Sequence, residues 1–237
     1  MSNPFFSFKQ FTIYQENVAM KVTTDACILG AYAQSKQPKK ILDIGSGTGI
    51  LSIMLAQRYK SAEVDGIESD LLSTNQAKSN VNACAWHDRI RIHHNRIQDY
   101  VKQINYKYDL IICNPPYYEN QLKSVSQRKK RARHAIDLQF SDLAYAINKL
   151  IKEKGNFYTI VPCESFQRLK YELSFFRVMQ FDYLEIFSIP GKPMNRIIGG
   201  FSKTRRKKIE KKLTLMNEMK EYSTFFKHLL RDFYLAF

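Results

Sequence analysis

Several features that mark other protein classes are scarce or absent in this sequence. The chain has four cysteines, and no two of them form a C-x-x-C pair. Their spacing argues against a disulfide framework and against a cysteine zinc site. We therefore expect Cys27, Cys84, Cys113 and Cys163 to be reduced residues, most of them in the core.

Long apolar segments are also missing. No run of about 18 apolar residues occurs, so no segment is long enough to form a transmembrane helix. Residues 1–9 lack the basic region and the apolar stretch of a signal peptide. Together with the cysteine pattern, these absences predict a cytoplasmic protein that has no membrane partner and binds no metal.

Acidic residues are few relative to basic ones. The chain has 37 lysines and arginines against 22 aspartates and glutamates, which gives a net charge of +15. An excess of this size favours a polyanionic partner, and much of it lies in two short runs. The cations that we predict to contact nucleic-acid phosphates are Arg128, Lys129, Lys130, Arg131, Arg133, Lys203, Arg205, Arg206, Lys207 and Lys208.

Apolar strand patterns alternate with helical patterns along most of the chain. Strands are predicted at residues 40–44, 62–67, 89–93, 107–113 and 155–161, and helices at residues 49–59, 70–85, 97–104 and 139–153. Alternation of this kind predicts an α/β protein with a doubly wound, mostly parallel sheet of the Rossmann-like type.

The C-terminal third departs from this alternation. After a predicted helix at residues 164–174, two apolar runs at residues 181–189 and 197–202 are separated by Pro190-Gly191-Lys192-Pro193. These runs predict an antiparallel hairpin that closes the edge of the sheet. A further edge strand is predicted at residues 213–216 and a terminal helix at residues 222–235.

The length of the chain suits one domain of enzyme size, residues 1–237. Within it, residues 1–35 are expected to form an N-terminal extension and residues 36–237 the Rossmann-like core. The stretch at residues 118–139 is longer than an ordinary loop and carries the first basic run, so we predict that it recognises the substrate.

A glycine turn follows the first predicted strand. It reads Gly45-Ser46-Gly47-Thr48-Gly49, and Asp43 lies just before it. Glycines at such a corner let the backbone approach a nucleotide closely. The G-x-G-x-G spacing differs from the G-x-G-x-x-G pyrophosphate fingerprint, which favours a cofactor without pyrophosphate such as S-adenosylmethionine. Glu68 ends the next strand and is predicted to bind the ribose hydroxyls.

The strand at residues 107–113 stops abruptly at Asn114-Pro115-Pro116-Tyr117. Two prolines cannot extend a central strand because they lack N–H donors. The Asn114 side chain and the Pro115 carbonyl then form a fixed pair of acceptors beside an aromatic ring, which suits a flat base with an exocyclic amine. The motif resembles motif IV of the amino-methyltransferases, which use S-adenosylmethionine to methylate adenine N6, cytosine N4 or a protein glutamine N5.

Two N-terminal segments narrow this resemblance. Phe8-Lys9-Gln10-Phe11 and the segment around Thr24-Asp25 resemble the opening of the bacterial valine-tRNA adenine-37 N6-methyltransferases, and the likeness runs through most of the chain. The resemblance implies S-adenosylmethionine-dependent methylation of the N6 amine of adenine 37 beside the anticodon. It implies catalytic roles at the target adenine for Asn114, Pro115, Pro116 and Tyr117, and cofactor contacts for Thr24, Asp25, Asp43, Gly45, Gly47, Gly49, Glu68, Ile97 and Asn114.

The chain departs from the family pattern at two positions. Thr23 stands where the family often has glycine, and Arg96 stands in place of an Asp that usually meets the cofactor adenine. Asn95, Gln98 and Asp99 are the candidates to take over that contact.

Three other functions fit parts of the pattern. A methyltransferase that acts on adenine N6 in ribosomal RNA or DNA shares both motifs and the basic charge. A protein-glutamine N5-methyltransferase shares the Asn-Pro-Pro-Tyr corner but has no use for the charge, and a non-catalytic RNA-binding module represents a different class. The sequence leaves open which tRNA is chosen, which flanking bases are read, the oligomeric state, and whether Tyr117 or Tyr118 stacks on the target base.

Overall fold

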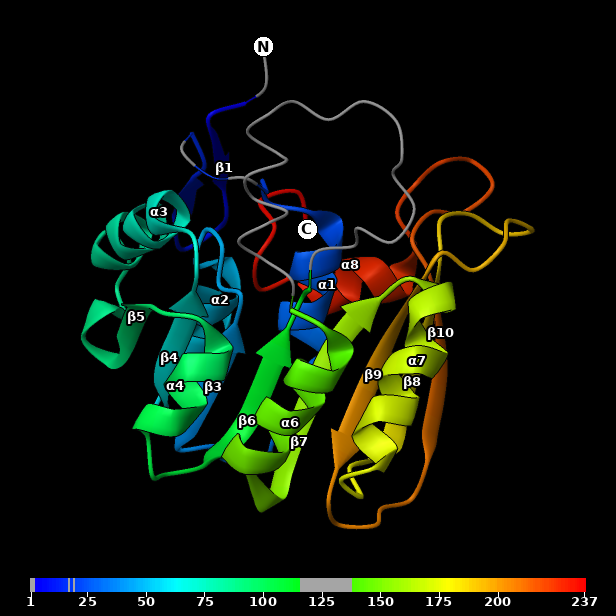
Figure 1. Ribbon diagram of the computed structural model, residues 1–237. Helices are drawn as coiled ribbons and strands as arrows, with labels where there is room; N and C mark the ends of the chain where they lie inside the picture. The colour runs from blue at the N-terminus through cyan, green and yellow to red at the C-terminus, as the bar shows by residue number, and fades with distance from the viewer. Residues whose placement is uncertain (1–2, 17, 19, 116–137) are drawn as a thin grey trace, which may run out of the picture.

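The computed structural model describes residues 3–16, 18, 20–115 and 138–237. In this part of the chain the largest sheet has the strand order β10-β8-β9-β7-β6-β3-β4-β5 (Figure 1). The strands are β3 (Lys40–Ile44), β4 (Glu63–Glu68), β5 (Ile90–His94), β6 (Tyr108–Cys113), β7 (Ile151–Val161), β8 (Met179–Phe187), β9 (Arg196–Ser202) and β10 (Ile209–Thr214). Neighbours are parallel except at β9, which is antiparallel to β7 and β8. The prediction of a mostly parallel, doubly wound α/β sheet is confirmed.

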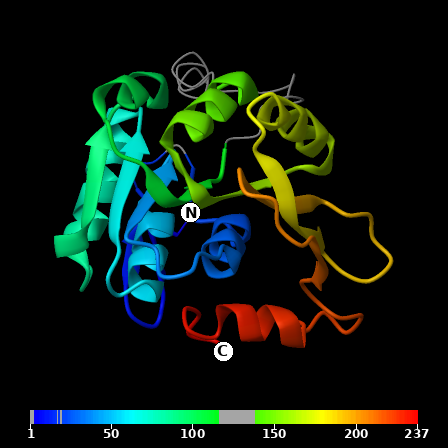
Figure 2. The same ribbon diagram turned by 90° about the horizontal axis from the view of Figure 1, so that it is seen from below.

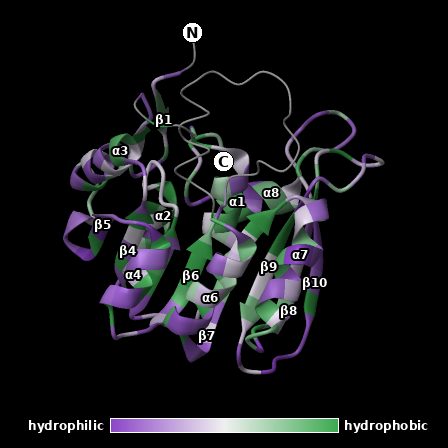
Figure 3. Cartoon of the chain, in the orientation of Figure 1, coloured by the Kyte–Doolittle hydropathy of each residue, from purple (hydrophilic) through white to green (hydrophobic). Residues whose placement is uncertain are grey.

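Helices cover both faces of this sheet (Figure 2). The first face carries α1 (Thr24–Tyr32), α2 (Ile50–Arg58), α3 (Leu71–Asn82) and α8 (Thr224–Leu230), and the second carries α4 (Ile97–Gln103), α6 (Phe140–Leu150) and α7 (Cys163–Ser174). Leu110 and Ile112 of β6 belong to the first core cluster, whereas Ile111 and Cys113 belong to the second. A strand buried on both faces needs such a continuous apolar run, because successive side chains point in opposite directions. Figure 3 shows hydrophobic residues concentrated in these central strands.

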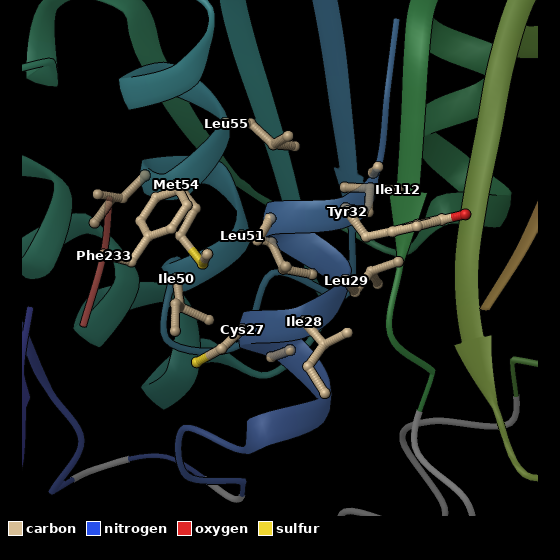
Figure 4. Close-up of a cluster of buried hydrophobic side chains, with 14 of the residues drawn as sticks. Cys27, Ile28, Leu29, Tyr32, Ile50, Leu51, Met54, Leu55, Ile112 and Phe233 are labelled. Carbon is tan, nitrogen blue, oxygen red and sulfur yellow. The ribbon is translucent and has the colours of Figure 1, made fainter. Parts of the chain in front are cut away.

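Helix α1 is buried almost all round, which is why its sequence shows no polar face. In the close-up of Figure 4, its residues Cys27, Ile28, Leu29 and Tyr32 pack beside the α2 side chains Ile50, Leu51, Met54 and Leu55. Thr23 is the N-cap of α1, and its hydroxyl accepts a hydrogen bond from the Ala26 N–H at 3.2 Å. Its backbone is extended, so a threonine occupies the place of the family glycine without strain.

The N-terminal residues form a small antiparallel hairpin of β1 (Phe5–Ser7) and β2 (Thr12–Tyr14), which the sequence did not predict. Asn80 of α3 attaches this hairpin to the core. Its side chain accepts a hydrogen bond from the Tyr14 N–H at 3.0 Å and donates to the Tyr14 carbonyl at 2.9 Å. The division of residues 1–237 into one domain with an extension at residues 1–35 stays a prediction.

The predicted helix at residues 139–153 was too long at its C-terminal end. Helix α6 ends at Leu150, and β7 begins at once with Ile151, well before the predicted strand start at residue 155. Ile151 pairs with Tyr108 of β6, and the register then shifts so that Leu110 pairs with Asn156. The Lys-Glu-Lys segment that looked helical lies in this bulge, where pairing between strands outweighs local helix propensity.

The C-terminal strands differ from the prediction in order. Strands β8 and β9 form the predicted antiparallel hairpin, but this hairpin does not close the sheet, because β10 lies outside β8 and runs parallel to it. The edge strand covers Ile209–Thr214 instead of residues 213–216, and α8 covers Thr224–Leu230 instead of residues 222–235. Exposed Ile209, Glu210 and Lys211 gave no apolar run that would have marked the start of β10.

All four cysteines are free thiols, and Cys27, Cys84 and Cys113 are buried as predicted. Cys163 is half-buried at the start of α7. Among the described residues, no helix has both the length and the apolar character needed to cross a membrane.

Candidate active site

A cavity opens at the carboxyl ends of β3, β4 and β6, where the sheet order makes the glycine turn, Glu68 and Asn114 neighbours. Its remaining walls come from the segment before α1 and from the start of α4. The predicted site residues that line it are Gly45, Gly47, Glu68, Ile97, Asn114 and Pro115. Residues far apart in the sequence therefore converge on one crevice.

The glycine turn has the backbone geometry that its sequence predicts. Gly45, Gly47 and Gly49 have φ angles of 73°, 55° and 81°, a region that other residues rarely adopt. A Cβ built on Gly45 or Gly47 meets no atom within 4 Å, so both face open space on the cavity side. Gly49 is instead the N-cap of α2, and a Cβ built on it would lie 3.4 Å from the Cβ of Ala77 in α3, so glycine here allows close packing of the two helices.

Glu68 joins the glycine turn to the start of α3. Its Oε2 accepts a hydrogen bond from the Gly47 N–H at 2.9 Å, and its Oε1 accepts one from the Asp70 N–H at 2.9 Å. The side chain is buried at the cavity wall. Each carboxylate oxygen keeps a second lone pair, so both can still accept hydrogen bonds from the hydroxyls of a ribose.

Asp43 lies fully buried beneath the glycine turn. Its Oδ2 accepts a hydrogen bond from the Ser52 hydroxyl at 2.7 Å, while its Oδ1 has no hydrogen-bond partner among the described residues. Burial raises the pKa of Asp43 to about 7, the Ser52 hydrogen bonds oppose the rise, and the charge of Glu68 adds to it. Asp43 therefore titrates near neutrality.

Thr24 and Asp25, for which the family resemblance implies cofactor contacts, lie in the first turn of α1. Thr23 and Ala26, on either side of Thr24 and Asp25, line the cavity wall. The Asp25 carboxylate accepts a hydrogen bond from Nε of Arg196 in β9 at 2.8 Å. Cofactor contact by Thr24 and Asp25 stays a prediction.

The start of α4 forms the part of the wall where the sequence left the adenine contact open. Asn95, Arg96 and Gln98 line the cavity beside Ile97. The Gln98 side-chain amide donates to Oδ2 of Asp142 in α6 at 3.1 Å, which orients it. Asp99 instead forms an exposed pair with Lys102 at 2.9 Å. Of the three candidates for the adenine contact, Asn95 and Gln98 line the cavity and Asp99 does not, and the contact itself stays a prediction.

Asn114 and Pro115 follow the last residue of β6 and line the same cavity. Asn114 is half-buried and Pro115 is buried. Pro116, Tyr117, Tyr118 and the basic residues Arg128, Lys129, Lys130, Arg131 and Arg133 lie outside the described residues. Their predicted roles in catalysis and RNA binding stay predictions.

The second basic run is far from this cavity. Residues 203–208 connect the end of β9 to the start of β10. Because β9 is antiparallel and β10 is parallel to the other strands, this connection lies at the amino ends of the parallel strands, opposite the cavity. Lys203, Arg205, Arg206, Lys207 and Lys208 therefore do not belong to the cavity wall.

Some residues that line the cavity were not predicted from the sequence. Lys21 and Val22 precede α1, and Leu138 follows the segment outside the described residues, and all three line the cavity. No local pattern marks them, because only tertiary contacts bring them to the strand ends. Ser46 had a signal, since it lies inside the glycine turn.

The walls fit S-adenosylmethionine. Oδ1 of Asp43 and Oγ of Ser46 are buried without hydrogen-bond partners among the described residues, which is expected where a ligand or water completes the site. Ile44, Ile67 and Ile97 supply apolar surface, and Glu68 places a carboxylate in the wall, where its contact with a ribose stays a prediction. The described residues hold no group of three His, Cys, Asp or Glu side chains arranged to bind a metal ion.

Comparisons with known proteins agree with this chemistry. A family model described as the methyltransferase small domain matches residues 22–140. A tRNA1(Val) (adenine(37)-N6)-methyltransferase of Trichodesmium erythraeum is 36% identical over 234 residues, which cover 98% of each chain. The protein of the same name from Dyadobacter fermentans is 44% identical over 166 residues, covering 70% of this chain and 68% of the relative. That from Bacteroides thetaiotaomicron is 35% identical over 99% of each chain.

Solved structures share the fold. A predicted O-methyltransferase from Agrobacterium tumefaciens superposes with a TM-score of 0.70 at 17% identity, covering 88% of this chain and 96% of that one. A TehB-like S-adenosylmethionine-dependent methyltransferase from Corynebacterium glutamicum gives a TM-score of 0.50 at 14% identity, covering 78% and 90%. With the fold of an S-adenosylmethionine-dependent methyltransferase and similarity along its whole length, the chain belongs to the tRNA1(Val) (adenine(37)-N6)-methyltransferase family.

Proposed function

We propose that the chain transfers the methyl group of S-adenosylmethionine to the N6 amine of adenine 37 in valine tRNA, in the cytoplasm. The observation that carries the proposal is the position of Asn114 and Pro115 on the wall of the cofactor cavity, at the end of the strand beside the glycine turn. Family membership supports the choice of tRNA as the substrate.

The reacting amine needs activation by acceptors. The lone pair of N6 is delocalised into the adenine ring, which makes the free base a weak nucleophile. The Asn114 side-chain oxygen and the Pro115 carbonyl each accept one N6 hydrogen, which moves the nitrogen toward tetrahedral geometry and directs its lone pair at the methyl group. Both oxygens also stabilise the positive charge that develops on the nitrogen. The bound cofactor supplies an electrophilic methyl group on a sulfonium.

This mechanism requires no strong base at the amine. Among the described cavity residues, the carboxylates of Glu68 and Asp70 already accept hydrogen bonds from backbone N–H groups. Glu68 accepts one from the Asp70 N–H at 2.9 Å, and Asp70 accepts one from the Ser73 N–H at 2.8 Å. Burial raises the pKa of the Cys113 thiol, and the nearby Asp43 charge raises it further. Cys113 therefore stays protonated and is unsuited to covalent chemistry.

The remaining roles fall to residues outside the described part of the chain. Tyr117 or Tyr118 stacks on an adenine turned out of the anticodon loop, which costs less there than in a duplex. Arg128, Lys129, Lys130, Arg131 and Arg133 bind phosphates that flank the target base. The net charge of +15 supports a substrate of this kind.

Methyl transfer from labelled cofactor distinguishes the candidate substrates. The purified chain is incubated separately with unmodified valine tRNA, ribosomal RNA, double-stranded DNA and a release-factor protein, and products are identified by nucleoside and peptide mass spectrometry. We expect N6-methyladenosine at position 37 of valine tRNA only. Methyl groups found only in another substrate, or in none of the four, would overturn the proposal.

A further inference from the structure

Residues 203–208, here called the basic loop, form a positively charged segment at the end of the sheet opposite the cavity (Figure 1). Arg205, Lys207 and Lys208 have exposed side chains there. The cavity chemistry described above uses none of these cations. Their concentration in one connection between β9 and β10 therefore calls for a separate explanation.

The basic loop is held firmly against the bulge at the start of β7. The Lys203 ammonium donates to the Asn148 carbonyl at 2.8 Å, the Thr204 hydroxyl donates to the Glu153 carbonyl at 2.9 Å, and Nη2 of Arg206 donates to the Lys154 carbonyl at 2.7 Å. The Arg206 guanidinium also lies 4.9 Å from the centre of the Phe181 ring. These anchors fix the direction of the loop, so its exposed cations form a pre-organised surface.

Other cations crowd the same end of the sheet. Burial lowers the pKa of Lys203, and the positive charges of Lys107 and Lys149 lower it further, against the opposing charge of Glu153. Lys107 precedes β6 and Lys149 lies in the last turn of α6, so both lie at the amino ends of the parallel strands. Like charges gathered this closely repel one another, and a polyanion that binds there relieves the repulsion.

Two further lysines lie on the outer edge of the sheet, next to the exposed Glu210. Lys211 and Lys212 follow the basic loop on β10, which is hydrogen-bonded to β8 on one side and is the last strand of the sheet. Lys212 lies 3.4 Å from Glu185 and its side chain is 75% exposed, so its charge is only partly compensated. Strand β10 runs from the basic loop toward the end of the sheet that holds the cavity.

We propose that the basic loop binds the phosphate backbone of the RNA stem next to the loop that carries the target adenine, at a distance from the cavity. This inference rests on the proposed function. Strand β9 has seven residues, so about 20 Å separates its two ends at roughly 3.3 Å per residue. Successive phosphates of one strand advance about 3.4 Å along the axis of a duplex, so the contact falls roughly six or seven base pairs from the target.

The same lysines also suit a second role, which makes a specific test necessary. An exposed edge strand such as β10 is a template for pairing with another chain, and edge lysines prevent that pairing. In that case loss of the cations would promote self-association and leave RNA affinity unchanged. RNA affinity and oligomeric state therefore have to be measured on the same variants.

The test compares two RNAs that share the anticodon loop, one with a stem of about four base pairs and one with a stem of about twelve. The variant R205Q/K207Q/K208Q removes three exposed cations of the basic loop. A matched control, K60Q/K78Q/R91Q, removes three exposed cations near β4, α3 and β5, at the opposite edge of the sheet from β10. Affinity is measured by fluorescence anisotropy at several salt concentrations, and self-association by sedimentation velocity.

We expect the basic-loop variant to lose affinity only for the long-stem RNA. The slope of log K against log salt should fall in magnitude by about two to three for that RNA, or nearly one for each phosphate contact removed. The control variant should leave both RNAs unaffected. An equal loss on both RNAs, an equal loss in the control, or self-association without loss of RNA affinity would each overturn the proposal.

A separate readout keeps this inference distinct from the proposed function. The unsubstituted chain is tested for methyl transfer to the adenine of the short-stem RNA and of intact valine tRNA. If neither RNA is methylated, the proposed function fails, whereas the dependence of affinity on stem length still decides whether the basic loop binds a stem.

Discussion

The Glu68 carboxylate accepts a hydrogen bond from the backbone N–H of Gly47 at 2.9 Å. This contact ties the last residue of β4, in the cavity wall, to the turn that follows β3. The same side chain accepts a hydrogen bond from the Asp70 N–H at the start of α3. One carboxylate therefore sets the relative position of two strand ends and faces the ribose site that they enclose.

Replacement of Glu68 by Gln should weaken cofactor binding. An amide offers one acceptor oxygen, so its NH2 group must face either the Gly47 or the Asp70 N–H. We expect the Kd for S-adenosylmethionine to rise at least about tenfold, which is ~1.4 kcal/mol, measured by isothermal titration calorimetry. Glu63→Gln is the control, because Glu63 is an exposed residue of the same strand that pairs with Lys40 at 2.9 Å. A Kd that is unchanged in the Glu68 variant would contradict this role.

Asn114→Ala should remove an acceptor from the reacting amine. We expect turnover to fall about 100-fold or more while the Kd for the cofactor changes little, because the lost interaction is made to the substrate amine. Single-turnover assays and calorimetry measure the two quantities. Asn114→Asp keeps an acceptor oxygen and should recover part of the rate. Near-normal turnover in the alanine variant would remove Asn114 from the mechanism.

Cofactor affinity should depend on pH through Asp43. Its pKa of about 7 is raised, so between about pH 4 and pH 7 the folded protein binds one proton more than the unfolded chain. The contribution of Asp43 to stability without cofactor is therefore greatest at low pH and falls as the pH rises to 7. An ionised Asp43 favours the cationic cofactor, so the Kd should decrease from pH 5.5 to pH 7.5.

The variant Asp43→Asn provides the check on that titration. It carries no ionisable group at this position, so the pH dependence of the Kd should flatten between pH 5.5 and pH 7.5. In thermal melting without cofactor, the variant should not show the loss of stability with rising pH that Asp43 causes in the unsubstituted chain. If the Kd of the variant keeps its full pH dependence, the titrating group is a residue other than Asp43.

Gln98→Ala should impair recognition of the cofactor adenine. The Gln98 side chain lines the cavity and is oriented by Asp142, whereas Asp99 pairs with Lys102 outside it. We expect Gln98→Ala to raise the Kd by about three- to tenfold, the value of one hydrogen bond, and Asp99→Ala to leave it unchanged. A cofactor analogue with hypoxanthine in place of adenine gives the decisive comparison. Equal weakening of both ligands would indicate a structural effect instead of base recognition.

Asp109 should contribute stability that is lost in acid. Burial opposes its ionisation, but hydrogen bonds from Lys152 and from the N–H groups of Lys40 and Lys39 outweigh burial and lower its pKa. Because its folded pKa is depressed, the contribution is present above about pH 4 and lost as the pH falls through the folded value. We expect Asp109→Asn to reduce the free energy of unfolding by about 1 to 3 kcal/mol at pH 7.

Urea unfolding at pH 7 and at pH 3 tests this contribution. The difference between the unsubstituted chain and Asp109→Asn should shrink at the lower pH. Asp99→Asn is the control, because its exposed pair with Lys102 is expected to contribute little at either pH. A difference that stays constant with pH would show that the Asp109 charge does not stabilise the fold.

Much of the site was predictable from local sequence signals. The apolar runs of β3 and β6 are buried on both faces, the glycines of the turn adopt positive φ angles, and Asp70 caps α3 through a hydrogen bond of 2.8 Å to the Ser73 N–H. The boundary between α6 and β7 was missed, because pairing between Ile151 and Tyr108 joins residues that no local window connects. Helix α1 was missed because it is buried almost all round and shows no polar face, and the β1–β2 hairpin was missed because each of its strands has only three residues.

The amino-acid sequence by itself determined the α/β alternation, the glycine turn and the proline stop at Asn114, because each depends on the conformational limits of a few consecutive residues. Tertiary structure alone decided that Asp43 is buried with one oxygen that has no hydrogen-bond partner in the described part of the chain, that Asp25 meets Arg196, and that the basic loop lies opposite the cavity. Burial, strand order and the direction of β9 arise from contacts across the whole chain. They therefore have no local sequence signal.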